Sequence, residues 1–505
     1  MLLPSVTMTP YRLLAERFDR HYVLRSSADL LEWDAQAMMP DGGGDLRAAQ
    51  LGTLRVLAHE AIALPDMEER LTAAEAAPPE DEWERANVAS MRRAWVHAAA
   101  VPADLVDAHA RAASACELAW RAARRDDDFA SLLPQLAQVV QLTRQVGEAK
   151  AAVMKLSVYD ALADEHEPGA REALLDPLFS RLARELPPLV DAIIEEQARA
   201  PRPPDPRGPF PVARQAALGR HLAERMGFDF TRGRLDVSAH PFCGGAAEDV
   251  RMTTRYDEQS FLPSILGVIH ETGHALYEMG LPRAWVRQPV GRAVGMGLHE
   301  SQSLLMEMQA GRSPEFLGYL AGVAARELGV DPAVLSKEAL VAQALRVERT
   351  LIRVDADEAT YPLHVIVRFT LERALLSGDL AVKDLPGAFR DAMERVVGIR
   401  PATDRDGCLQ DVHWPSGSFG YFPSYTIGAI AAAQLFAKAL SEHPGIPSEL
   451  ARGELGTLRA FAREHVHQHG SRFDTNAILT RATGRPLDVE ALLAHLRRRY
   501  LPSGA

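Results

Sequence analysis

The amino-acid sequence predicts an all-α protein, and three observations support this. Apolar residues recur every three or four positions over long segments rich in Ala, Leu, Glu and Arg, the spacing that lines one face of a helix. Runs that alternate apolar and polar residues, as half-buried strands do, are short and rare. Aromatic residues, which favour strands, make up only 6% of the chain. We therefore expect a mainly helical fold with little sheet.

The helical spacing is clearest in four segments, 136–156, 170–196, 332–352 and 455–467. Residues 201–211 carry six prolines, which lack the backbone donor of regular structure, so this stretch is predicted to be a loop between helical blocks. The chain has no fixed-period repeat and no Gly/Ser linker long enough to separate independent domains. We expect a single domain over residues 1–505, in which two helical subdomains flank a cleft.

The exception to the helical pattern is residues 234–254, the most plausible extended stretch. Gly244 and Gly245 in its middle are typical of a turn, which predicts two short strands joined at that point. We expect a small β-hairpin directly before the apolar segment that begins at Ile265.

Composition and charge exclude several classes of protein. Hydrophobic residues make up 47% and charged residues 25% of the 505 positions, as in soluble globular proteins. A net charge of -12 without a basic block argues against nucleic acid as the main partner. The odd, widely spaced Cys116, Cys243 and Cys408 favour a reducing compartment over a disulfide framework. Neither a signal peptide nor a membrane span is recognisable, so we expect a cytoplasmic protein.

The strongest chemical signal is the sequence His270-Glu271-Thr272-Gly273-His274 within an apolar run. Residues four apart share one face of a helix, so both imidazoles can bind one metal ion. A carboxylate directly after the first ligand, Glu271, can reach a water on the ion and act as general base. The motif predicts metal-assisted hydrolysis, most often of peptide bonds.

The alternative is an ordinary amphipathic helix with one buried and one solvated histidine. A His-Glu-x-x-His sequence arises by chance in roughly 4% of chains of this length and composition. Thr272 and Gly273 are small and uncharged, where a surface helix would carry charge, which favours a helix buried against the floor of a cleft.

A catalytic zinc takes three protein ligands, so one ligand remains to be found. Glu278 lies a further turn along the same straight helix and cannot converge with both histidines, so we expect it beside the ligands. Glu300 opens the next apolar helical run, and a helix crossing the first can direct its carboxylate to the ion. The neighbouring His299 is expected near the site or in the core. Such a ligand set suits one zinc ion per chain, although cobalt or manganese also fit.

Further segments follow one another in a recognisable order. They are Trp33-Asp34, Met39-Pro40, Gly42-Gly43-Gly44, Arg47 and Gln50, 159–162, 167–169, His240-Pro241-Phe242, 249–253, 270–274, 299–302, 352–357 and 407–414. In these segments the chain resembles the carboxypeptidase Taq family of metallocarboxypeptidases, and the resemblance runs nearly end to end. The six segments from 240 onward are the diagnostic ones, and none has a broken position.

The resemblance implies His270, His274 and Glu300 as metal ligands and Glu271 as general base, in agreement with the helix geometry. It also implies a mainly helical zincin-like fold, with a deep central groove and the metal on its floor. The implied substrates are peptides with a free C-terminal carboxylate. A cytoplasmic homodimer is implied as well.

Two further groups of residues would complete an exopeptidase. A developing oxyanion needs a donor besides the metal. The segment after His413 is similar to the donor segment of related dipeptidyl zincins, so Tyr421 and His413 are the expected donors. Tyr425 is the fallback, with a core aromatic as its alternative role.

Arginine suits a terminal carboxylate because its planar fork binds both oxygens. Arg353 is the leading candidate, since it matches the segment that the family uses for this purpose, and Asp357 is expected to orient it or a ligand. Arg251 is a second candidate, although a structural pair with Asp249 is equally plausible. His240 either contacts substrate or is a hydrogen-bonded turn residue.

Three functions are compatible with this pattern. The first is a metallocarboxypeptidase that removes single C-terminal residues with broad specificity. The second is an oligopeptidase or dipeptidase that cleaves within short peptides. The third is a non-catalytic peptide-binding protein, against which the intact Glu271 and the complete ligand set argue.

Overall fold

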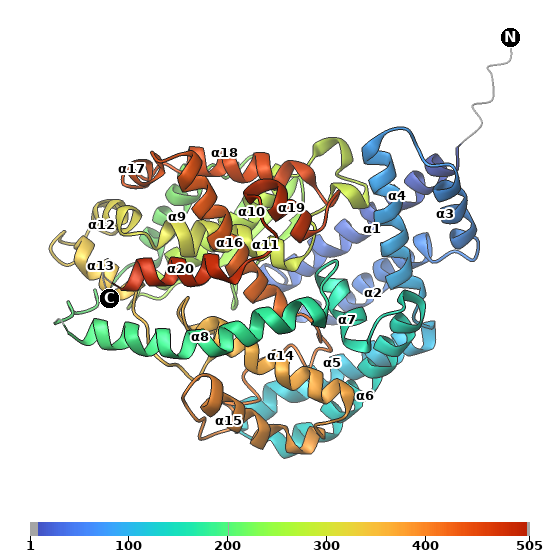
Figure 1. The fold of residues 1–505 in the computed structure, drawn as a ribbon, viewed down its shortest axis with the longest axis horizontal. Coiled ribbons are helices and arrows are strands. Elements are labelled where there is room, and N and C mark those ends of the chain that lie inside the picture. The colour runs from blue at the N-terminus through green and yellow to red at the C-terminus, as the bar shows by residue number, and fades with distance from the viewer. Residues whose placement is uncertain (1–8, 200, 502–505) are drawn as a thin grey trace, which may run out of the picture.

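The computed structural model describes residues 9–199 and 201–501, and it confirms a mainly helical fold (Figure 1). The described α-helices are α1 (Pro10–Ala37), α2 (Gly44–Ile62), α3 (Met67–Ala76), α4 (Glu82–Ala99), α5 (Ala103–Asp126), α6 (Phe129–Met154), α7 (Val158–His166), α8 (Glu172–Ala198), α9 (Val212–Met226), α10 (Leu262–Gly280), α11 (Met296–Leu304), α12 (Pro314–Leu328), α13 (Lys337–Ala344), α14 (Tyr361–Ser377), α15 (Leu385–Val396), α16 (Pro423–Glu442), α17 (Ile446–Leu450), α18 (Gly456–His465), α19 (Thr475–Thr483) and α20 (Val489–Tyr500). A π-helix, Leu305–Gly311, continues α11. Within the described ranges, no helix combines the length and the apolar character needed to cross a bilayer.

The predicted hairpin is present, but its turn lies elsewhere and a third strand joins it. The strands are β1 (Gly233–Val237), β2 (Cys243–Ala246) and β3 (Asp249–Thr254), in the order β1-β3-β2. β1 runs parallel to β3, and β2 runs antiparallel to it. Gly244 and Gly245 lie inside β2, and the turn falls at residues 247–248. A Cβ on Gly245 would lie 2.2 Å from the carbonyl oxygen of Asp249, so this glycine allows close strand approach.

One helix prediction is largely wrong. Of residues 332–352 only α13 is helical, and residues 345–352 are irregular. There a side chain replaces the helical hydrogen bonds, because the Gln197 amide donates to the carbonyl of Leu345 and accepts from the backbone N–H of Val347. The other three predicted segments correspond to α6, α8 and α18, and 201–211 is irregular as expected.

The buried apolar residues form two large clusters that meet along α16. One cluster draws on α6, α8, α14, α15 and α20. The other draws on α9, α10, α11, α12, α18 and α19. α16 supplies Ile430 to the first cluster and Ala431 to the second, and it crosses the middle of the molecule in Figure 1. The division of the chain into two helical subdomains stays a prediction.

Candidate active site

Helix α10 carries the two histidines. It is apolar nearly all round, and β3, α9 and α11 pack against it. Because His270 and His274 are four residues apart, their rings lie on one face, with centroids 4.9 Å apart. Both rings line a cavity of about 590 Å³.

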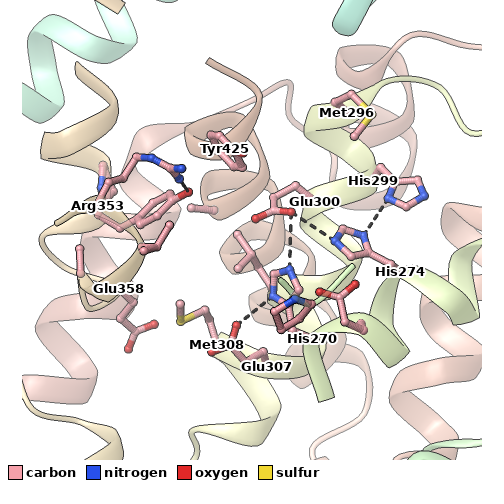
Figure 2. Close-up of a pocket in the computed structure, with 18 of the residues that line it drawn as sticks. His270, His274, Met296, His299, Glu300, Glu307, Met308, Arg353, Glu358 and Tyr425 are labelled. Atoms are coloured by element: carbon pink, nitrogen blue, oxygen red, sulfur yellow. Dashed lines mark hydrogen bonds and ion pairs between the residues drawn. The ribbon is translucent and has the colours of Figure 1, made fainter. Parts of the chain in front are cut away.

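Helix α11 crosses α10 at Gly273. A Cβ on Gly273 would lie 2.5 Å from the carbonyl oxygen of Gln302, so only glycine allows this close crossing. The crossing brings Glu300 over the histidines, with its Oε2 3.4 Å from Nε2 of His274 and 3.8 Å from Nε2 of His270 (Figure 2). One ligand atom from each residue lies within 4.8 Å of the other two. Two imidazole nitrogens and a carboxylate oxygen at this spacing fit a divalent metal.

A second carboxylate orients His270. Nδ1 of His270 lies 3.0 Å from Oε2 of Glu307, a residue of the π-helix. Arg312 in turn donates to Oε1 of Glu307 at 2.7 Å. This contact engages Nδ1 and leaves Nε2 directed at Glu300, as metal-binding histidines require.

A separate chain of contacts lies behind His274. Nδ1 of His274 is 2.7 Å from Nδ1 of His299, whose Nε2 is 2.9 Å from the carboxylate of Glu278. Both His299 and Glu278 therefore lie beside the three grouped residues and hold the second imidazole in place.

Glu271 faces the cavity from α10 and is 6% exposed. Its Oε2 has no hydrogen-bond partner in the described part of the chain. Burial raises the pKa of Glu271 to about 7, against the lowering effect of the His270 charge. An unpartnered buried carboxylate oxygen next to the ligand group is suited to accept a proton from water.

An arginine lies at the other end of the cavity, opposite the histidines (Figure 2). Arg353 is 6% exposed and lines the cavity. Its Nε donates to Oδ1 of Asp411 at 2.9 Å, and its Nη1 donates to the Tyr361 hydroxyl at 2.6 Å. Asp357, expected to orient Arg353 or a ligand, instead accepts from the backbone of Thr360 at the start of α14. The orienting acid is Asp411, which sequence reasoning missed although it lies in the recognised segment 407–414.

Tyr421 and Tyr425 line the cavity between its two ends. Burial raises the pKa of Tyr425 to about 12, so its hydroxyl is a donor at neutral pH. His413, predicted as a donor, lies behind this wall with Nε2 3.1 Å from the Tyr425 hydroxyl. Burial lowers the pKa of His413 to about 4. The imidazole is therefore neutral and contacts Tyr425, not the cavity.

Two predicted substrate contacts are not brought to this cavity. His240 is exposed and does not line the cavity, whereas Phe242 in the same loop does. The Ser238 hydroxyl donates to the carbonyl of His240. Arg251 pairs with Asp249 at 2.7 Å and lies over the Trp33 ring, so the structural alternative describes it.

Helix α20 supports the part of the cavity wall that contains Glu358. Glu358 lines the cavity and pairs with His495 and Arg499 of α20, at 3.1 and 2.9 Å. Arg499 also donates to the carbonyl oxygens of Met308 and Gln309 in the π-helix. α20 thereby ties together two walls of the cavity.

The fold and the site place the chain among the helical metallopeptidases. Residues 13–500 match the model of the carboxypeptidase Taq (M32) metallopeptidase family, and the chain belongs to this family. It is therefore a metal-dependent carboxypeptidase, and the resemblance seen in the sequence is confirmed.

Known relatives match over nearly the whole chain. Thermostable carboxypeptidase 1 of Thermus thermophilus is 39% identical, over 98% of this chain and 99% of the relative. The solved structure of Trypanosoma cruzi metallocarboxypeptidase 1 superposes with a TM-score of 0.95 at 39% identity, covering 98% of this chain and 99% of that one. An M32 carboxypeptidase from Deinococcus radiodurans gives 0.90 at 34% identity, covering 97% and 98%.

Proposed function

We propose that the protein releases single amino acids from the C-termini of peptides, with broad specificity. One divalent metal ion, for which zinc is the most suitable choice, is held by His270, His274 and Glu300. The observation that carries this proposal is one cavity with a three-residue ligand group at one end and Arg353 at the other. Such a cavity engages a peptide bond and a chain terminus together.

Glu271 is the general base in this proposal. A bound divalent metal supplies Lewis-acid polarisation of the scissile carbonyl and lowers the pKa of water. Glu271 accepts the proton of the attacking water at its unpartnered Oε2 and passes it to the leaving amine. This assignment makes the chain a gluzincin, with the HExxH motif on one helix and the glutamate ligand on another.

Arg353 binds the terminal carboxylate. Its guanidinium is fixed by Asp411 and Tyr361, so little side-chain freedom is lost when the substrate binds. Because the arginine has a fixed place in the cavity, the last peptide bond is the one held near the ligand group.

The tyrosines of the wall are the oxyanion donors in this proposal. Tyr425 and Tyr421 both line the cavity, and their rings lie 5.3 Å apart. His413 supports them through its contact with the Tyr425 hydroxyl. A donor aimed at developing negative charge accelerates acyl transfer.

The decisive experiment compares a peptide with a free C-terminus and the same peptide ending in an amide, by mass spectrometry over time. We expect a ladder that shortens from the free C-terminus and no cleavage of the amide. Cleavage of both peptides at an internal bond would support the oligopeptidase alternative. Glu271→Gln should retain its metal and lose hydrolysis, and an active Glu271→Gln protein would contradict the mechanism.

We propose a homodimer in the cytoplasm as its working state. The reducing compartment is supported by Cys116, Cys243 and Cys408, which are all free thiols. The dimer is supported by the family resemblance, and light scattering of the purified protein would test it. A monomer at micromolar concentration would contradict it.

A further inference from the structure

Behind Arg353 lies a second arginine that does not reach the cavity. Arg368, on α14, is 0% exposed. Its Nε donates to Oδ2 of Asp411 at 2.8 Å, and its Nη1 donates to the carbonyl of His364 at 3.1 Å. Burying a charged arginine is costly, so its presence behind the site calls for an explanation.

The charges of this cluster do not cancel. Asp411 is shared by both guanidinium groups, with Arg353 on Oδ1 at 2.8 Å and Arg368 on Oδ2 at 2.8 Å. Burial lowers the pKa of His413 to about 4 and that of His364 to about 3, so both imidazoles are neutral at pH 7. Two positive groups therefore face one negative group, and the cluster carries one net positive charge.

That net charge matters for a carboxylate arriving at Arg353. A pair of Arg353 and Asp411 alone is formally neutral, and the aspartate behind the guanidinium repels an incoming anion. Arg368 occupies the other oxygen of Asp411 and offsets this repulsion. In a buried site with low dielectric screening, such an offset changes the affinity for an anion substantially.

We propose that Arg368 is a positioning residue for recognition of the substrate C-terminus. It holds Asp411 from the far side and keeps the Arg353–Asp411 unit positively charged. The inference rests on the proposed role of Arg353 as carboxylate receptor, and it concerns substrate binding, not the bond-breaking step.

The chain offers a matched control on the same helix. Arg373 also lies on α14 and is ion-paired, but its partners are Glu172 and Asp176, both at 2.5 Å. It is partly exposed and does not line the cavity. Replacing Arg373 removes an arginine and its ion pairs from α14 without touching Asp411.

The experiment measures kcat and KM of the metal-loaded enzyme with a short N-blocked peptide, for Arg368→Met, Arg368→Gln, Arg368→Lys and Arg373→Met. We expect Met and Gln to raise KM about tenfold or more, with kcat nearly unchanged, because binding of the carboxylate is weakened uniformly. Lys keeps the charge and should retain a KM near that of the parent, as should Arg373→Met. Calorimetric titration of the metal-free proteins with the product amino acid should rank the affinities in the same way.

The inference is overturned if Arg368→Met or Arg368→Gln is folded by circular dichroism and its KM stays within about twofold of the parent. It is equally overturned if Arg368→Lys raises KM about tenfold, because charge is then not the cause. If the Met and Gln proteins fail to fold, the Lys protein decides alone.

Failure of the proposed function gives a different result. If the parent enzyme cleaves C-terminally amidated peptides as readily as free ones, Arg353 is not a carboxylate receptor and both ideas fall. If amidation blocks cleavage but Arg368→Gln binds normally, only the role of Arg368 is wrong.

Discussion

Buried negative groups are in excess at one end of the cavity, and buried positive groups are in excess at the other. At one end, the carboxylates of Glu271, Glu300 and Glu307 surround two imidazoles, and Arg312 pairs with Glu307 only. At the other end, Arg353 and Arg368 share the single carboxylate of Asp411. A buried excess of charge costs free energy unless a ligand of opposite charge binds there. The difference teaches that a cation fits the first end and an anion fits the second, which agrees with the proposed metal site and the proposed carboxylate receptor.

The two ends also differ in how the chain assembles them. The first end, with His270, His274 and Glu300, is the proposed metal end, and it comes from α10, α11 and the π-helix, which are close together in the sequence. The second end, with Arg353, is the arginine end. At the second end, Arg353 contacts Asp411, which lies 58 positions further along the chain. Asp411 also contacts Arg368 on α14, a helix that lies between them in the sequence. Substitutions at the two ends, and at a buried acid outside them, should therefore differ in whether they change metal content, substrate binding or stability.

The largest effect is expected at the metal end. His274→Ala removes one of three ligands, so it should lose the metal and at least about a thousandfold in kcat/KM. Metal analysis by mass spectrometry together with kinetics checks this. The control is His240→Ala, which replaces an exposed histidine and should keep both metal and activity. Stoichiometric metal in the His274→Ala protein would show that the ligand assignment is wrong.

A somewhat smaller effect is expected at the arginine end. Arg353→Ala should retain its metal and lose about a hundredfold in kcat/KM on free peptides, because a buried partner of the carboxylate is removed. The change should appear mainly in KM. Arg251→Ala is the matched control, since Arg251 pairs with Asp249 outside the cavity. Parent-like kinetics of Arg353→Ala would place the carboxylate receptor elsewhere.

A third change weakens the metal end without removing a ligand. Glu307→Gln takes the charge from the group that orients His270, and it should lower metal affinity about 10- to 100-fold. Competition with a chelator measures this affinity. Glu338→Gln, on the exposed side of α13, should behave like the parent. An unchanged affinity would mean that His270 is oriented by its own helix.

The smallest effect on catalysis is expected at a buried acid that neither end compensates, where the change concerns folding stability. Glu372 is 0% exposed, and burial raises its pKa from 4.5 to about 7 despite a hydrogen bond from Tyr159. Because the folded state holds the proton more tightly, the contribution of Glu372 to stability is fully present below pH 4.5 and is lost as pH rises to about 7. Linkage puts this loss on the order of 3 kcal/mol. Glu372→Gln should reduce the pH dependence of the unfolding free energy over this window, to which Glu167 and Glu271 also contribute, and an unchanged slope would refute the assignment.

The sequence predicted the metal end better than the arginine end, for a physical reason. Spacing along a helix fixes which side chains share a face, so His270 and His274 could be paired without coordinates. Asp411 and Arg368 become partners only through packing of distant segments, and Arg368 lies within an ordinary apolar helix pattern. Glycine was misread as a turn at Gly245 because the same residue also serves close strand contacts.

The contacts of Arg499 determine when the cavity wall can assemble during synthesis of the chain. A ribosome delivers the chain from its N-terminal end, so Met308 of the π-helix emerges 191 residues before Arg499, which donates to its carbonyl. Before α20 has formed, Glu358 lacks both of its ion-pair partners on that helix, His495 and Arg499. The cavity wall is therefore complete only after α20 has been made and has packed against the π-helix and Glu358.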